Sequence, residues 1–187
     1  MPRRILLLFS FFAALLIVSS ELAGQTGRPL TTSSRRARVA YERALEAYGM
    51  VDYQTALDQL TAALSRDENF LEAYLLKAEI HQSQGNYRQS IDPYRRVIEL
   101  DSLFYPAAFF YLGKSFWHTG QYLEAENALE VFINMEAVVP ESLMDPAKDL
   151  LARCVFALDA MASPVPFEPV NPGPAINSRS REHWHTL

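Results

Sequence analysis

The four histidines are the side chains best suited to acid–base or metal chemistry, and they are scattered along the chain. His81 and His118 fall in separate helical segments, whereas His183 and His185 form an H-x-H pair near the end. A protein zinc site needs three or four ligands held together. The H-x-H pair could bind a metal only with further ligands, which the sequence does not identify. We therefore expect no metal site and no cofactor, and we expect His81 at the edge of the core.

Catalytic motifs are absent from the sequence: it has no nucleophile elbow, glycine-rich phosphate loop, paired cysteines or His-Glu-x-x-His. Glu126 and Glu130, one helical turn apart, are most simply a solvated acidic face. The single cysteine, Cys154, lies in an apolar helical pattern and is expected to be a small buried hydrophobe. No catalytic residue is predicted, and the protein is expected not to be an enzyme. A carbohydrate- or peptidoglycan-processing enzyme would need a carboxylate pair in a cleft, which the sequence does not place.

A repeated phrase shows which elements the chain does contain. The stretches "MVDYQTALDQL", "QGNYRQSIDPY" and "TGQYLEAENAL" align at Tyr53, Tyr87 and Tyr122, at spacings of 34 and 35 residues. A period of this length is typical of stacked helical hairpins. Each unit has apolar residues at three- and four-residue steps in two segments, joined by a tight turn such as that at Gly85. We expect each tyrosine ring to cover its turn and to pack on the next hairpin.

Small residues mark the points where the two helices of each unit are expected to cross. Where antiparallel helices approach closely, one must present a side chain small enough to admit the other. In the first helices and then the second, these residues are Ala44, Ala78 and Gly113, and Ala56, Ser90 and Ala125. A hairpin cannot bury its apolar face alone, so at least about three must stack.

This pattern resembles the tetratricopeptide repeat, which has a small residue in its first helix, Gly-x-Tyr at its turn and Ala in its second helix. The resemblance covers residues 37–139, as units 37–70, 71–104 and 106–139. The first unit departs at Val51, where glycine is usual, and at Glu68, where proline is common. The resemblance implies an all-α, right-handed solenoid of three hairpins that binds a protein or peptide.

The resemblance also implies a binding groove, because the first helix of each unit lines the concave side of such solenoids. Aromatic rings flanked by sparse charges suit an extended peptide or a partner helix. The residues that the register places in the groove are Arg38, Tyr41, Tyr48, Leu75, Glu79, Gln82, Phe110, Lys114, Trp117 and His118. Several of these aromatics could instead pack only against the neighbouring hairpin or the tail.

Pro93 breaks a local rule, because it falls inside the second helix of the second unit. Proline lacks the N–H of a helical hydrogen bond and clashes with the preceding turn. Since Tyr94, Val97 and Ile98 continue the helical step, we predict a kink at Pro93 rather than a helix end.

A seventh helix, at residues 141–162, is expected to cap the solenoid. Asp145 can accept hydrogen bonds from the first N–H groups, and Pro146 suits the first helical position. The buried stripe is predicted to be Leu150, Leu151, Cys154, Val155 and Leu158. Such a helix would cover the last apolar face of the array.

The N-terminus has the layout of a secretory signal peptide, which we place at residues 1–25. Two arginines precede an apolar run at residues 5–18, and small and polar residues follow. A membrane anchor is the alternative, but the run is shorter than the about 20 residues needed to span a bilayer. Cleavage after Ser20 and cleavage between Ala23 and Gln25 both remain open. The mature protein is expected to have no integral membrane span or lipid-anchoring cysteine, and to be periplasmic or secreted, with outer-membrane association as an option.

Residues 163–187 are rich in proline and lack a helical period, so an extended tail is expected. Its stretch "PVNPGPAINSRSREHW" is similar to the junction between a tetratricopeptide region and a β-propeller in OmpA/Pal-like envelope proteins of the Bacteroidota. The matching residues are Ile176, Asn177, Ser178, Glu182 and Trp184. This resemblance implies a location in the cell envelope, either as a truncated product of a longer protein or as a short form. It carries over no propeller or peptidoglycan-binding residue.

The net charge of −5 argues against nucleic acid as a partner, since binding to phosphates needs clustered Lys and Arg. The sequence therefore predicts an exported, non-enzymatic scaffold that binds a protein or peptide in the bacterial cell envelope. The alternative is a structural spacer or assembly fragment whose groove is occupied by its own tail. The identity of the partner and the oligomeric state stay open.

Overall fold

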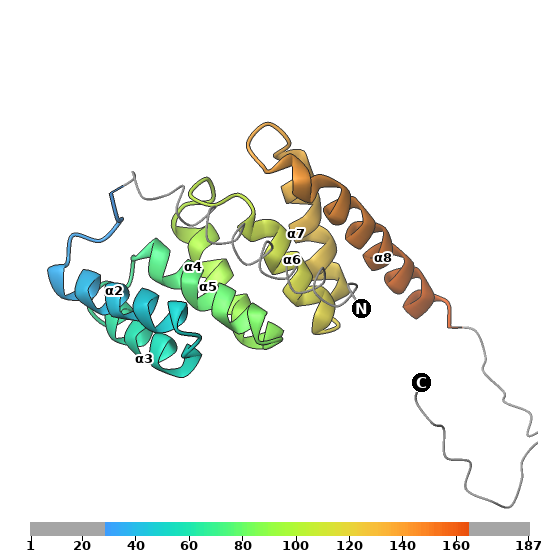
Figure 1. Ribbon diagram of the computed structural model, residues 1–187. Coiled ribbons are helices and arrows are strands. Elements are labelled where there is room, and N and C mark those ends of the chain that lie inside the picture. Colours follow the sequence, from blue (N-terminus) through green and yellow to red (C-terminus); the bar gives the residue numbers. More distant parts are fainter. Residues whose placement is uncertain (1–28, 165–187) are drawn as a thin grey trace, which may run out of the picture.

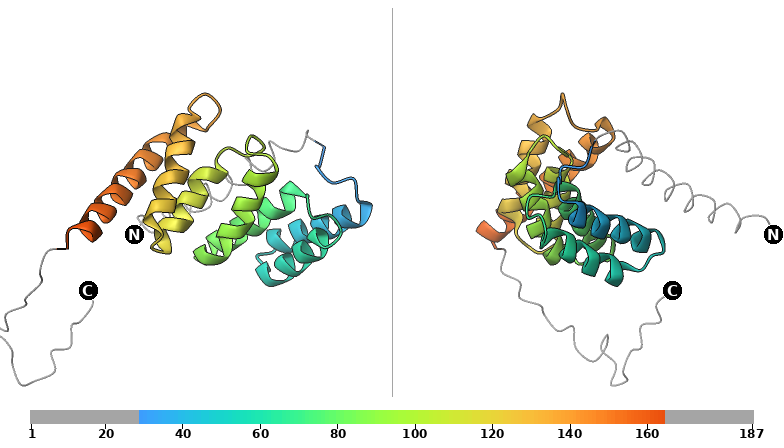
Figure 2. Two further views of the ribbon diagram at one scale, coloured as in Figure 1. Left: turned by 180° about the vertical axis from the view of Figure 1, so that it is seen from behind. Right: turned by 90° about the vertical axis from the view of Figure 1, so that its left-hand side faces the viewer.

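The computed structural model describes residues 29–164 of the chain, and within them the protein is all-α. The helices in chain order are α2 (Arg35–Gly49), α3 (Tyr53–Leu64), α4 (Leu71–Ser83), α5 (Tyr87–Leu100), α6 (Ala108–His118), α7 (Tyr122–Asn134), the short 3-10 helix η1 (Glu141–Leu143) and α8 (Met144–Ala162). Three hairpins lie in a row with α8 at the far end (Figures 1 and 2). The predicted hairpin solenoid is confirmed. The expected signal peptide, and all but the first two residues of the expected tail, lie outside the described residues.

The three hairpin turns share one backbone geometry. A residue with positive φ precedes the start of each second helix: Val51 at 62°, Gly85 at 73° and Gly120 at 77°. The next N–H bonds to a carbonyl five positions back, in the pairs Asp52 to Ala47 (2.9 Å), Asn86 to His81 (2.8 Å) and Gln121 to Phe116 (2.9 Å). This is the Schellman ending of a helix, which favours glycine at the positive φ. The first turn keeps this geometry although a β-branched valine is strained there.

The predicted close crossing is confirmed in the third hairpin, and the small residues of the other two are buried as such crossings require. Ala44, Ala56, Ala78, Ser90 and Ala125 are all fully buried. At the remaining position, Gly113, an added Cβ would lie 2.8 Å from Cγ of Leu129 and 3.3 Å from the carbonyl oxygen of Ala125. The helices α6 and α7 are therefore in contact at a spacing that only glycine permits without a shift.

The repeated tyrosines Tyr53, Tyr87 and Tyr122 are the first residues of α3, α5 and α7. Only Tyr87 makes its ring contact with the next hairpin, where it stacks on His118 with centroids 3.8 Å apart. The other two contact rings of their own hairpin, Tyr48 at 5.9 Å and Trp117 at 5.0 Å. The expected corner position is confirmed for all three, and a ring–ring contact across hairpins is confirmed for Tyr87.

The helix α4 divides the apolar interior between two clusters. Its Leu76 and Ile80 belong to a cluster with the first hairpin, and its Leu71 and Leu75 belong to a cluster that extends through the other hairpins to α8. A helix with apolar residues on more than one side is buried between neighbours. The stacking order of the hairpins thus follows from the sequence of α4.

The lead-in before α2 is tied to the start of α4. The Glu72 carboxylate accepts hydrogen bonds from the Thr31 N–H at 3.1 Å and from its hydroxyl at 2.5 Å. The Thr31 hydroxyl in turn accepts the N–H of Leu71 at 3.1 Å, and Thr32 donates to Asp67 at 2.5 Å. Since no side chain of its own caps α4, Thr31 satisfies one of the unpaired N–H groups at this helix start. The sequence did not predict this contact.

Pro93 is buried within α5, and the helix continues through it to Leu100. The expectation that the proline does not end the helix is confirmed, and the kink itself stays a prediction.

The end of the array differs from the expectation in two details. The helix α8 begins at Met144, one residue before Asp145, and no side chain caps it, so the predicted Asp145 cap is wrong. Cys154 is fully buried as expected, but Val155 is 42 % exposed, so its expected place in the buried stripe is wrong. Leu150, Leu151 and Leu158 are half-buried. None of the helices in residues 29–164 is long and apolar enough to cross a membrane.

Candidate partner-binding surface

Three of the ten predicted groove residues lie in the core. Tyr41, Leu75 and Phe110 are only 5 %, 2 % and 8 % exposed. The ring of Tyr41 packs on Phe70 at 4.9 Å, and that of Phe110 packs on Phe132 at 5.7 Å. These side chains hold the hairpins together and leave any partner contact to the other seven.

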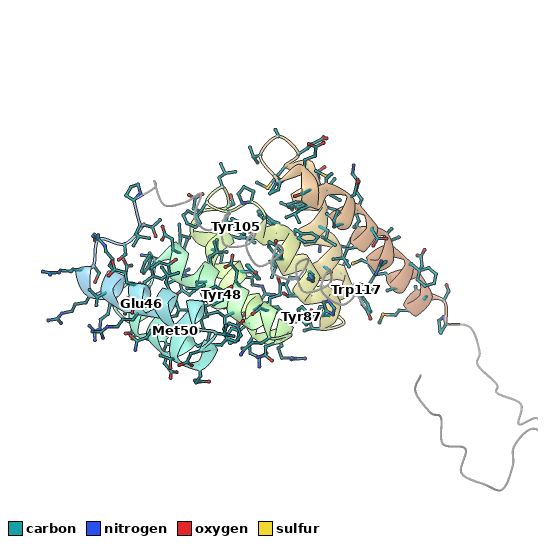
Figure 3. All side chains as sticks on the ribbon, in the orientation of Figure 1. Glu46, Tyr48, Met50, Tyr87, Tyr105 and Trp117 are labelled. Carbon is teal, nitrogen blue, oxygen red and sulfur yellow. The ribbon has the colours of Figure 1, made fainter. Side chains whose placement is uncertain are left out.

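The other seven are exposed or half-buried and come from the first helices of three successive hairpins. We name them the A-helix surface: Arg38 and Tyr48 from α2, Glu79 and Gln82 from α4, and Lys114, Trp117 and His118 from α6. Figure 3 labels Tyr48 and Trp117 near its two ends. The structure therefore keeps side chains of all three repeats available on these helices.

Gln82 fixes the second hairpin to the third. Its amide nitrogen donates to the carbonyl of Tyr111 and to the hydroxyl of Ser115, both at 3.0 Å. The Ser115 hydroxyl also lies 2.7 Å from that of Ser90 in a buried pair. A buried polar network that is fully satisfied makes an arrangement rigid. The middle of the A-helix surface is thus held in place by hydrogen bonds.

Glu79 gives this surface an acidic centre. Burial raises the pKa of Tyr48, and the nearby Glu79 carboxylate raises it further. The same two causes, in the same order, raise the pKa of Tyr94 well above its ordinary value. Both phenols therefore keep their protons at neutral pH, and their hydroxyls can donate hydrogen bonds.

Paired rings form the end of the surface at α6. His118 stacks on Tyr87 with an interplanar angle of 9°, and Trp117 packs on Tyr122. Burial and the nearby Lys114 lower the pKa of His118, so its imidazole is neutral at pH 7. Neutral stacked rings are preorganised for contact with a partner, because little side-chain freedom is left to lose.

Tyr105 and Tyr111 were missed by the sequence reasoning. Tyr111 stacks between Tyr94 and Tyr105, with centroids 6.0 and 6.3 Å apart. Tyr105 precedes α6 and is the additional residue that lengthens the second spacing from 34 to 35. Its aromatic type at an insertion was the available signal. Figure 3 shows it on the connection between the second and third hairpins.

No set of three or more His, Cys, Asp or Glu side chains between residues 29 and 164 could hold a metal ion, and His183 and His185 lie outside that range. Burial, with a contribution from Glu126, raises the pKa of Cys154 to about 11, so the thiol is protonated at neutral pH. His81 is half-buried at the edge of the core, and burial and Lys77 lower its pKa.

Stacked hairpins with a Schellman turn, a buried small pair and a first-helix surface define a helical repeat protein of the interaction-module class. The profile of the tetratricopeptide repeat matches residues 41–103 and 75–132. The chain belongs to the tetratricopeptide repeat family.

Solved structures share this fold at low sequence identity. The tetratricopeptide domain of Sgt2 from Aspergillus fumigatus is 18 % identical, with a TM-score of 0.56, over 77 % of this chain and 95 % of that one. The secretion chaperone SycD of Yersinia enterocolitica, in complex with a peptide of the translocator YopD, is 22 % identical with a TM-score of 0.58, over 66 % and 95 %. The TPR2B domain of yeast Sti1, in its pHsp70 complex, is 18 % identical with a TM-score of 0.56, over 66 % and 98 %. A comparison with curated proteins gives no match.

Proposed function

We propose that this protein is a non-enzymatic tetratricopeptide scaffold that binds a protein or peptide partner in the bacterial cell envelope. The observation that carries the proposal is the A-helix surface itself. Three successive hairpins contribute to it, and its rings and its central Gln82 are held by stacking and hydrogen bonds. Rigid aromatic side chains supply most of the binding energy at protein interfaces.

Two of the similar structures support this mode of use. SycD is seen with a peptide of YopD, and the Sti1 domain is seen with pHsp70. The envelope location is supported by the signal-like residues 1–25 and by the resemblance of the tail to an envelope-protein junction.

Substitution of surface aromatics tests the proposal. The double variant Tyr48→Ala with Trp117→Ala removes two half-buried rings from opposite ends of the A-helix surface. Cross-linking in envelope extracts, with captured polypeptides identified by mass spectrometry, should show a partner band that this variant loses.

Leu123→Ala is the matched control, because Leu123 is a 57 % exposed apolar side chain on α7, outside this surface. Equal capture by the wild-type chain and the double variant would remove the A-helix surface as the binding site.

One observation favours the alternative of an assembly fragment. Phe156 and Met161 on α8 are 74 % and 67 % exposed, and Val155 lies beside them. Such apolar residues at the end of the array suit a contact with the chain's own tail or another domain. Deletion of residues 163–187 distinguishes the two functions: a lower melting temperature favours tail docking, whereas unchanged stability with lost partner capture favours an exposed recognition segment.

A further inference from the structure

A cavity of about 530 Å³ opens between α2 and α3, and arginines dominate its lining. We name this cavity the first seam. Its charged and polar side chains are Arg35, Arg36, Arg43, Arg66 and Gln59. None of these residues belongs to the A-helix surface, so the first seam is a separate feature. All of the residues that line it are exposed or half-buried, so the first seam is open to solvent.

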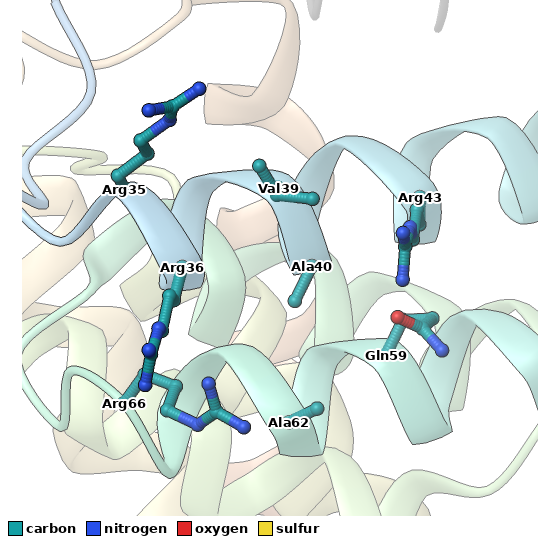
Figure 4. A pocket seen from close by; sticks show the side chains of 8 residues that line it. All are labelled: Arg35, Arg36, Val39, Ala40, Arg43, Gln59, Ala62 and Arg66. Carbon is teal, nitrogen blue, oxygen red and sulfur yellow. The ribbon is translucent and has the colours of Figure 1, made fainter.

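Three of the guanidinium groups line the first seam, at its two ends. Figure 4 shows Arg36 and Arg43 extending from α2 toward α3, with Arg36 approaching Arg66 and Arg43 approaching Gln59. The side chain of Arg35 points away from them. The guanidinium groups of Arg36 and Arg66 therefore lie together at one end of the first seam, and Arg43 lies with the amide of Gln59 at the other end.

The charge of the first seam is not compensated within the described part of the chain. None of the residues that line it is acidic. The ion pairs found in residues 29–164 involve Arg95, Arg96 and Arg153 instead. Like charges held close together repel, and an anion placed among them relieves that repulsion. Guanidinium groups bind phosphate through two parallel hydrogen bonds, which makes arginine the preferred residue for phosphate.

A second cavity lies along the second hairpin, and we name it the second seam. Its arginines form ion pairs, unlike those of the first seam. A shift of 34 residues relates Arg43 to Lys77 and Ala62 to Arg96. In the second seam, however, Arg95 pairs with Asp92 at 3.8 Å, and Arg96 pairs with Glu99 at 3.4 Å. Both seams are rich in cations, but only the second supplies its own anions.

The first seam also has an apolar floor. Val39 is 40 % exposed, and Ala40 and Ala62 are half-buried. A ligand that combines a phosphate with an apolar portion would contact both the arginines and this floor. An acidic polypeptide would satisfy the arginines and leave the floor in water.

The first seam lies close in sequence to a segment suited to membranes. Only 16 residues separate the apolar run at residues 5–18 from Arg35, a reach of at most roughly 60 Å when fully extended. The first hairpin is thus the described part of the chain nearest to the segment expected to engage the export membrane. We propose that the first seam binds the phosphate headgroup of an anionic phospholipid.

Vesicle binding tests the proposal on residues 26–187, which lack the apolar run but keep the described helices whole. Vesicles of equal parts phosphatidylglycerol and phosphatidylcholine should bind this chain, and pure phosphatidylcholine vesicles should not. The triple variant Arg36→Gln, Arg43→Gln and Arg66→Gln should lose affinity about a hundredfold, since three charges near the lipid surface are removed. High salt should weaken binding by the unchanged protein.

The matched control is Lys77→Gln, Arg95→Gln and Arg96→Gln, which removes three charges from the second seam and should leave binding unchanged. Circular dichroism of both variants checks that the helices persist. Absence of binding to the anionic vesicles, or an equal loss in both variants, would overturn the proposal. Two other ligands test the alternatives. If the chain binds polyglutamate more tightly than the anionic vesicles, and the first triple variant abolishes that binding, the ligand is an acidic polypeptide and the proposal is overturned. The same result with soluble glycerol 3-phosphate would overturn it in favour of a free phosphate ester.

Discussion

The first and second hairpins share the backbone geometry of the repeat, but they differ in side chains at the turn and between the helices. Their turns have the same Schellman hydrogen bonds, yet one carries Val51 and the other Gly85 at positive φ. Their first seam and second seam overlap in part under a shift of 34 residues, as at Arg43 and Lys77, yet only the second pairs its arginines with carboxylates. The repeat thus fixes backbone geometry and small buried residues, and leaves the chemistry of the seams to vary.

The interior of the two hairpins differs in the same way. At the position of the fully buried Leu60 in the first hairpin, the second has Tyr94, which is 1 % exposed and stacks on Tyr111 of the third. Where the first has Ala56, the second has Ser90, whose hydroxyl reaches Ser115 of the third. The second hairpin is therefore joined to its successor by aromatic and polar contacts, whereas the first meets its successor through an apolar cluster.

Removal of the buried ring gives the largest expected effect. Tyr94→Ala should lower the free energy of unfolding by about 3–5 kcal/mol, because it leaves a ring-sized cavity between two hairpins. Urea denaturation measures the loss. Leu60→Ala is the counterpart in the first hairpin and should cost less, since a smaller side chain is removed. A larger loss at Leu60 than at Tyr94 would contradict the second hairpin's closer connection to its successor.

Exchange of the buried proline gives the next largest effect. Pro93→Gln introduces the residue that the first hairpin has at this position, Gln59, and restores one helical N–H donor. The free energy of unfolding should rise by up to about 3 kcal/mol. The packing of the buried proline ring is lost in the exchange, and this loss reduces the gain. Thermal denaturation followed by circular dichroism would show the gain, and Gln89→Ala, one turn earlier on α5 and exposed, is the control. A loss of stability on exchange would mean that the proline's packing outweighs its helical cost.

The smallest expected effect concerns the strained turn. Val51→Gly should raise the free energy of unfolding by about 0.5–1 kcal/mol, since glycine adopts positive φ without strain but loses more chain entropy. No packing is lost, because Val51 is 65 % exposed. The reverse exchange, Gly85→Val, should destabilise the second hairpin. Equal stability of all three proteins in urea denaturation would show that the positive φ carries no cost.

The period of the sequence was sufficient to predict the fold, because the small residues and the tyrosines recur at fixed offsets. Burial then follows from register, as at Ala44, Ala56 and Gly113. The contact between Thr31 and Glu72 could not be predicted in this way, since Thr31 precedes the first unit and lies 41 positions from Glu72. Register also could not separate groove from core at Tyr41 and Phe110.

The register of the repeat assigned the candidate residues to the first helices, and partner binding at those residues stays a prediction. Seven residues on the first helices remain at the surface, as the register requires, but register assigns side chains to a face without their depth. Tyr105 was missed because an inserted residue has no equivalent in the other unit. The first seam was missed because Arg36 and Arg66 are far apart in the sequence and lie side by side only after α2 and α3 pack together.

The lead-in threonines bear on the order in which this chain can acquire its structure. A polypeptide leaves a ribosome or a translocation channel with its N-terminus first. Thr31 and Thr32 therefore emerge well before Asp67 and Glu72, whose carboxylates accept hydrogen bonds from the threonine hydroxyls. During that interval the start of the array has no place to attach. Its final closure must therefore wait for the opening turn of α4, and the earliest residues to appear are among the last to settle.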